Sequence, residues 1–136
     1  MILLDTNVLS ELMRQAPNRA VMDWVDQQAT VDLFISAVTK AEIELGIGLV
    51  PDGKRKSQLE AAAHEVFAGF AERCLPFDGA AASVYARLVV HRTRSGTPIS
   101  VEDAQIAAIA VSHDLALATR NVGDFQRIEG LRVVSP

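Results

Sequence analysis

Five short, largely apolar runs recur along the chain, and segments with helical periodicity lie between them. The runs cover residues 2–4, 33–36, 73–77, 115–119 and 131–135. Runs that are apolar along their whole length are typical of strands covered on both faces. Strands that alternate with helices usually form a parallel sheet flanked by those helices. The sequence therefore predicts an α/β fold with a mostly parallel central sheet of about five strands.

The predicted helices have recognisable ends. They are expected over residues 8–13, 18–28, 37–49, 57–73, 78–96 and 100–113. Residues 57–73 place their apolar side chains on one helical face. Asp78 can cap the next helix, Gly96 can close it, and Pro98 blocks its continuation. Ser100 is a plausible cap for the last helix.

Length and composition restrict the class of protein. A chain of 136 residues has the common size of one domain, and we expect residues 1–136 to form a single domain. The net charge of −4 argues against a protein that holds nucleic acid by bulk positive charge. No apolar stretch approaches the ~20 residues that span a bilayer, and we expect no signal peptide. With Cys74 as its single cysteine, the chain is expected to be cytoplasmic, with no membrane partner.

Four acidic residues lie where a parallel sheet would bring them to one edge. Asp5 ends the first apolar run, and Asp124 follows the fourth. Glu42 lies on the helix after the second run, and Asp103 lies in the first turn after Ser100. Ligands of such sheets bind just beyond the carboxyl ends of the strands. Each acid has an alternative role: Asp5 and Asp103 as helix-capping acids, Asp124 as a turn residue, and Glu42 in a buried ion pair.

Glu42 is the most informative of the four acids. On a helical wheel, Val38, Leu45 and Leu49 fall on its side of the helix, whereas Lys40 and Glu44 fall on the opposite side. A carboxylate within an apolar stripe is costly to bury unless it is paired or coordinated. We therefore expect a function for Glu42 that its own helix does not supply.

Gathered carboxylates need a counter-charge. Two of them ~4 Å apart repel by about 4 kcal/mol at an effective dielectric constant of 20. An all-oxygen cluster of this kind selects a hard cation such as Mg²⁺ or Mn²⁺. A cation held by carboxylates supports phosphoryl transfer, because it binds a phosphate oxygen and lowers the pKa of a water molecule.

Four segments carry a resemblance to a known family. The segments "LLDTNVLSEL", "ISAVTKAEIELGIGL", "VEDAQIAAIA" and "ATRNVGDFQRIEGLRVVSP" resemble the PIN-domain family and, within it, the VapC/FitB-type toxins of bacterial toxin–antitoxin pairs. The resemblance implies a three-layer α/β/α PIN domain over residues 1–136 and a Mg²⁺-dependent ribonuclease activity, with Mn²⁺ as a substitute. It also implies an RNA substrate, a cognate antitoxin that blocks the site, a homodimer with larger antitoxin assemblies, and promoter DNA contacted only through the antitoxin.

The resemblance also assigns roles to individual residues. Asp5 and Asp103 would hold the principal Mg²⁺. Glu42 would orient the attacking water and Asp124 would complete the pocket, and both are further candidate metal ligands. Attack by water would leave 5′-phosphate and 3′-hydroxyl ends. The fourth acid falls on Asp124 or on the position of Asn121, and we prefer Asp124. Hydrogen bonds to the acids or to metal-bound water are implied for Thr6, Asn7, Thr119 and Asn121.

Two other functions are compatible with parts of the pattern. A non-catalytic PIN-like module would only bind a partner, although none of the four acids is missing. An aspartate-based phosphatase or receiver domain also has an acid after its first strand, but Asn7 and Arg120 stand where it usually has an acid and a lysine.

One basic face is left without a role. Arg87, His91 and Arg94 share a helical face and could meet RNA phosphates or simply be solvated.

Overall fold

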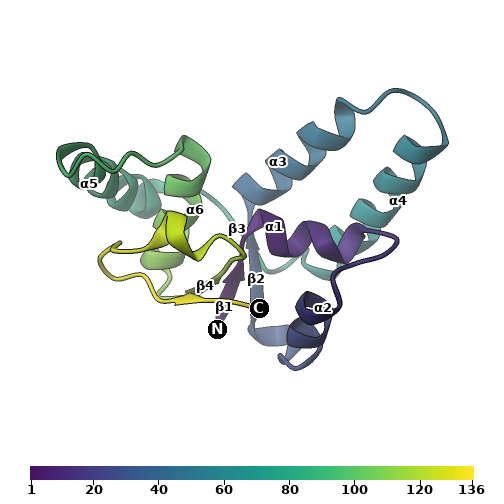
Figure 1. Ribbon diagram of the computed structural model, residues 1–136, viewed down its shortest axis with the longest axis horizontal. Helices are drawn as coiled ribbons and strands as arrows, with labels where there is room; N and C mark the ends of the chain where they lie inside the picture. Colours follow the sequence, from purple (N-terminus) through teal and green to yellow (C-terminus); the bar gives the residue numbers. More distant parts are fainter.

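A computed structural model describes all residues, 1–136. Its centre is a five-stranded sheet in the order β3-β2-β1-β4-β5, in which every neighbouring pair is parallel (Figure 1). The strands are β1 (Ile2–Leu4), β2 (Leu33–Ser36), β3 (Cys74–Leu75), β4 (Ala116–Ala118) and β5 (Val133–Val134). The predicted parallel sheet of about five strands is confirmed, and each strand lies within a predicted apolar run.

Six α-helices surround the sheet. They are α1 (Thr6–Leu9), α2 (Arg19–Asp26), α3 (Ala37–Gly48), α4 (Lys54–Gly69), α5 (Gly79–Arg94) and α6 (Val101–Ser112). Three short 3₁₀ segments are η1 (Ser10–Met13), η2 (Thr30–Asp32) and η3 (Val122–Phe125). The prediction of one helix over 8–13 is wrong, because α1 passes into η1 at Ser10. None of the helices combines the length and the apolar character that crossing a bilayer requires.

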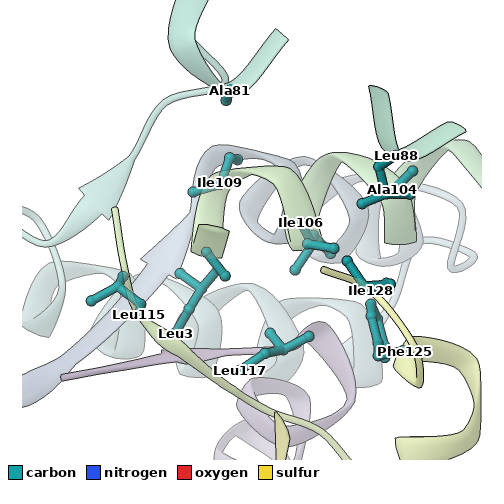
Figure 2. Packing of buried hydrophobic residues seen from close by; sticks show 12 residues of the cluster. Leu3, Ala81, Leu88, Ala104, Ile106, Ile109, Leu115, Leu117, Phe125 and Ile128 are labelled. Atoms are coloured by element: carbon teal, nitrogen blue, oxygen red, sulfur yellow. The ribbon is translucent and has the colours of Figure 1, made fainter. Parts of the chain in front are cut away.

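The alternation of side chains along the strands divides the core in two. Leu3 and Leu117 pack with α5, α6 and η3, as Figure 2 shows for Leu3, Leu117, Ile106, Ile109 and Phe125. Leu4 and Ala118 follow Leu3 and Leu117 in the strands, and their side chains point to the other face of the sheet, where they pack with α1–α4. Helices therefore cover both faces of the sheet, and the three-layer α/β/α architecture is confirmed (Figure 1).

Side-chain caps fix where the helices begin. The predicted caps hold: Asp78 accepts a hydrogen bond from the Ala81 amide at 3.0 Å, and Ser100 accepts one from the Asp103 amide at 3.2 Å. Gly96 has a φ of +69°, a conformation that suits glycine just beyond α5. The Ser100 cap fixes the start of α6 and therefore places Asp103 in the first turn of this helix.

Candidate active site

Three strands deliver their following residues to one edge. Asp5 comes directly after β1, Thr119 comes directly after β4, and Ser36 ends β2 and caps α3. The Asp5 amide donates to the Ala118 carbonyl at 2.9 Å, which extends the β1–β4 pairing up to this edge. Because β1 is the central strand, Asp5 lies between the groups that follow β2 and those that follow β4.

Asp5 is a buried carboxylate with only 4% of its surface exposed. Its Oδ1 accepts from the Thr6 amide at 2.9 Å, and its Oδ2 accepts from the Thr119 hydroxyl at 2.8 Å. Burial is the main reason why the pKa of Asp5 rises from 3.8 to about 6, and the two hydrogen bonds oppose that rise in pKa. The negative charges of Asp103 and Glu42 raise the pKa of Asp5 further. Asp5 does precede α1 as a cap, but capping accounts for neither its burial nor its acidic neighbours.

The Thr119 hydroxyl has a single direction in which it can donate. Its oxygen accepts from the Asn121 amide at 3.0 Å and from Asn7 Nδ2 at 3.3 Å. A hydroxyl has two acceptor lone pairs and one hydrogen, so the hydrogen is left for Asp5. Asn7 is fixed in turn, because its Oδ1 accepts from the Arg120 amide at 3.1 Å. Thr119 therefore binds Asp5 directly, whereas Asn7 is connected to Asp5 only through Thr119.

Glu42 is held by Thr6, the residue that follows Asp5. Its Oε1 accepts from the Thr6 hydroxyl at 2.8 Å, and the hydroxyl oxygens of Thr6 and Thr39 are 2.9 Å apart. Because the Thr6 hydrogen is given to Glu42, the Thr39 hydroxyl donates to Thr6. Partial burial is the main cause that raises the pKa of Glu42, and the charge of Asp103 adds to this rise.

Of the apolar stripe predicted around Glu42, only Val38 packs against the core. Leu45 is 64% exposed and Leu49 is 77% exposed, whereas Thr39 and Ile43 are the buried side chains of α3. The interpretation of a buried stripe was therefore wrong. Glu42 is half-buried because it leans toward the edge of the sheet, where Thr6 binds it.

Asp103 reaches the same edge from the first turn of α6. Partial burial chiefly raises the pKa of its carboxyl group, and a hydrogen bond with Ser100 lowers that pKa. The charges of Asp124 and Glu102 raise the pKa of Asp103 further. Asp103 therefore interacts electrostatically with Asp124, Asp5 and Glu42.

Asp124 and Asn121 lie on the loop after β4, and both are exposed. The Asn121 amide binds Thr119, and the Asp124 amide donates to the Asn121 carbonyl at 3.1 Å. The charge of the Asp124 carboxylate raises the pKa of Asp103, so Asp124 belongs to the same electrostatic group. The loop is pinned by Arg92, whose Nη2 donates to the Asp124 carbonyl at 3.3 Å.

Sequence reasoning missed three contributors to this edge. Thr39 was detectable, because it precedes Glu42 by one helical turn and shares its face. Arg92 also carried a signal, since it continues the buried side of α5 one turn after Leu88. Glu11 gave none: it is buried, and its binding partner Arg120 is 109 positions away in the chain.

Glu11 is an acid of a different kind. It accepts from the Asn18 amide at 2.8 Å, from Arg14 at 2.9 Å and from Arg120 at 3.1 Å. The amide hydrogen bond from Asn18 is the first cause that lowers the pKa of Glu11, and the two guanidinium groups lower it as well. Glu11 therefore anchors the residue next to Thr119 without carrying unbalanced charge.

The acids fit a divalent cation in donor type and in charge. Three carboxylates with raised pKa values, from Asp5, Glu42 and Asp103, form an all-oxygen donor set suited to a hard cation. No three His, Cys, Asp or Glu side chains are close enough together to hold a metal ion as they stand. The carboxylates would therefore move inward to bind a cation, which would relieve their repulsion.

Comparison with known proteins places the chain in a family. Residues 2–131 match the family model described as the PIN domain. The toxin FitB of Neisseria gonorrhoeae is 43% identical over 92% of this chain and 91% of its own length. A VapC ribonuclease of Sinorhizobium fredii, Y4jK, is 42% identical over 100% of this chain and 97% of its own length. A structure of FitAB bound to a DNA fragment superposes with a TM-score of 0.92 at 40% identity, covering 100% of this chain and 95% of that chain. The chain belongs to the PIN-domain family.

Proposed function

We propose that this chain is the toxin of a type II toxin–antitoxin pair and acts as a Mg²⁺-dependent endoribonuclease. The observation that carries the proposal is the convergence of Asp5, Glu42 and Asp103, each with a raised pKa, at the carboxyl edge of a PIN-domain sheet. A relative of similar length is named a VapC ribonuclease, and PIN-domain ribonucleases are generally dependent on a divalent metal ion.

Asp5 and Asp103 hold the principal cation in this proposal, with Glu42 and Asp124 as further ligands. Mg²⁺ is the expected ion, and Mn²⁺ can replace it. When bound, the cation supplies Lewis-acid chemistry and lowers the pKa of a water molecule. The Thr119 hydroxyl donates to Oδ2 of Asp5 and the Thr6 backbone amide donates to Oδ1, so both carboxylate oxygens of Asp5 serve as acceptors. Asn121 and Asn7 hold Thr119 in that orientation.

Glu42 has an oxygen available for the attacking water. Its Oε1 is occupied by the Thr6 hydroxyl, and its Oε2 can accept a water proton. The raised pKa of Glu42 favours that proton transfer. The water oxygen then bonds to phosphorus as the bond from phosphorus to the 3′ oxygen breaks, and the leaving 3′ oxygen takes a proton from solvent water. The products carry a 5′-phosphate and a 3′-hydroxyl group.

The partners follow from the relatives. The FitAB structure is a complex on DNA, and the proposal gives this chain a cognate antitoxin that covers the carboxylate edge and contacts promoter DNA itself. Residues 1–136 act as a single PIN domain, as a homodimer and within larger antitoxin assemblies. The site of action is the cytoplasm, where RNA is the substrate.

The test compares Asp5→Asn with Asp26→Asn, a matched substitution of an exposed acid at the end of α2. RNA cleavage in Mg²⁺ should fall more than ~100-fold in Asp5→Asn, since groups that only orient a metal ligand already contribute about 10–100-fold. Asp26→Asn should cleave like the wild type, and EDTA should stop cleavage until Mg²⁺ or Mn²⁺ is restored. Circular dichroism checks that both variants are folded.

Four results would contradict the proposal. Full activity in folded Asp5→Asn removes the acid from the site. Products with 2′,3′-cyclic phosphates, formed equally in EDTA, indicate a metal-free mechanism. Absence of cleavage by the wild type supports a non-catalytic module, and hydrolysis of phosphomonoesters alone supports an aspartate phosphatase.

A further inference from the structure

Basic side chains without partners gather beside α5. Of the 13 Lys and Arg residues, six form ion pairs and two, Arg73 and Arg92, donate to backbone carbonyls. The remaining five have neither kind of contact, and they are Lys54, Arg55, Arg87, Arg94 and Arg127. Lys54 and Arg55 begin α4, whereas the other three belong to α5 and the loop after η3.

A cavity of about 400 Å³ brings two of these arginines together. Arg87 and His91, one helical turn apart on α5, line one part of it, and Arg127 and Glu129 line another. Arg87 and His91 also line a neighbouring hollow together with Arg94. Besides Arg92, whose guanidinium group donates to backbone carbonyls, the cavity is therefore lined by two unpaired arginines and a histidine against one carboxylate.

The backbone at Arg127 supports a specific role for this loop. Arg127 has a φ of +61°, in the left-handed region that residues with side chains rarely adopt. Such conformations persist where the surrounding structure imposes them, and they cluster at ligand-binding segments. The loop thus keeps an arginine at a position where glycine would be less strained.

Arg92 joins the cavity to the candidate active site. Its buried side chain lines the cavity, while its guanidinium group donates to the carbonyls of Asp124 and Gln126 at 3.3 and 3.2 Å. Asp124 and Arg127 are three residues apart, so their Cα atoms are separated by at most ~10 Å. The segment that carries Asp124 therefore also lines the cavity, through Arg127, and Arg92 holds this segment in place.

We propose that Arg87, His91 and Arg127 form a phosphate-binding subsite that holds the RNA backbone a few nucleotides from the cleaved bond. The proposal rests on the ribonuclease function proposed above. Guanidinium groups bind phosphate oxygens in a bidentate manner, and imidazole can donate a hydrogen bond in either protonation state. Glu129 leaves the subsite with net positive charge and limits how closely a phosphate approaches the loop.

Charge favours RNA as the occupant. The chain carries a net charge of −4, and its candidate active site is itself acidic, so both repel a polyanion. Affinity for RNA must then come from local groups of free cations. The three unpaired arginines beside α5 are the larger such group, and they flank the loop that carries Asp124.

The experiment measures RNA binding by the full chain in EDTA, where no cleavage interferes. The probe is a fluorescent single-stranded RNA of 20 mixed nucleotides, titrated at several salt concentrations. Arg87→Gln/Arg127→Gln is compared with Lys54→Gln/Arg55→Gln, which removes the same charge from unpaired residues elsewhere. Loss of two phosphate contacts should make the slope of log K against log salt shallower by about 1.4. The control pair should keep the wild-type slope.

Melting temperatures check that the variants are folded, and Arg87→Lys/Arg127→Lys, which keeps both charges, should retain most of the slope. Equal slopes for the two Gln pairs overturn the subsite. If Arg87→Gln/Arg127→Gln changes only the oligomeric state, the face is a protein interface and the RNA subsite is wrong. A slope difference in a chain that cleaves no RNA in Mg²⁺ would contradict the proposed function while supporting the subsite.

Discussion

Asp5 and Glu11 are two buried carboxylates, six residues apart, with opposite electrostatics. Asp5 is 4% exposed and Glu11 is 3% exposed. The pKa of Asp5 rises to about 6, whereas the pKa of Glu11 falls below its ordinary value. Exposure alone therefore does not decide the pKa of an acid in this protein.

The difference lies in what covers each carboxylate. Asp5 lies deep at the sheet edge, with hydroxyl and amide donors but no cation, and with other acids nearby. Glu11 accepts hydrogen bonds from the Asn18 amide and from Arg14 and Arg120, whose side chains are 65% and 40% exposed. Cationic groups thus balance the charge of Glu11, whereas no cationic side chain binds Asp5.

Among the residues that support the two acids, the Thr119 hydroxyl beside Asp5 gives the largest expected effect. Thr119→Val keeps the shape of the side chain but removes the hydrogen bond to Asp5 and the acceptor for Asn121 and Asn7. Cleavage activity or Mg²⁺ affinity should fall about 10–100-fold, as it does when an orienting partner of a metal ligand is lost. Thr119→Ser, which keeps the hydroxyl, should stay close to the wild type. Equal activity of the two variants would show that Asp5 needs no such partner.

The pH dependence of stability should have opposite signs for the two acids. A raised pKa means that Asp5 stabilises the metal-free fold below pH 3.8, and that this contribution is lost as pH rises through about 6. A lowered pKa means that Glu11 stabilises the fold above pH 4.5, and that this contribution is lost as pH falls through its lowered pKa.

Asp5→Asn should remove only the first of these dependences. Between pH 4.5 and 7, its stability relative to the wild type should rise by about 2 kcal/mol, as the shift to about 6 implies. Urea unfolding in EDTA at both pH values measures this change. If the stability difference between Asp5→Asn and the wild type does not change with pH, ionisation of Asp5 does not destabilise the fold.

Glu11→Gln should have a smaller effect on stability and, unlike Asp5→Asn, should destabilise the fold at neutral pH. It weakens charge-assisted hydrogen bonds with two partly exposed guanidinium groups, and should destabilise the fold by about 1–2 kcal/mol at pH 7. RNA cleavage by the folded variant should be largely retained. A loss of cleavage as severe as in Asp5→Asn would place Glu11 in the catalytic site and end the distinction between the two acids.

Local patterns were sufficient to predict the layers of the fold and the edge on which the acids meet. Apolar runs identified all five strands, and Asp78 and Ser100 marked the starts of α5 and α6. Asp5 and Asp103 could be placed at one edge because parallel strands share a direction. Each of these inferences needs only neighbours in sequence and one topological rule.

Contacts between distant segments could not be predicted in the same way. A helical wheel gives the direction of Leu45 and Leu49 but not whether anything covers them, and both are exposed. The pairing of Glu11 with Arg120 and the three carbonyls bound by Arg92 depend on how loops meet after folding. The separation of the acids, too loose to hold a metal ion as they stand, is likewise a tertiary property.

The central claim is that the edge of Asp5, Glu42 and Asp103 is a cation site that the fold maintains at a cost. The direct measurement is the Mg²⁺-induced shift in stability of the wild type, Asp5→Asn and Glu11→Gln at neutral pH and low salt. The wild type should gain about 2.7 kcal/mol when Mg²⁺ is in hundredfold excess over its Kd, and Glu11→Gln should gain as much from its lower starting point. Asp5→Asn should be the more stable protein in EDTA and should gain little from Mg²⁺. An equal gain in all three proteins, or none in the wild type, would contradict the claim.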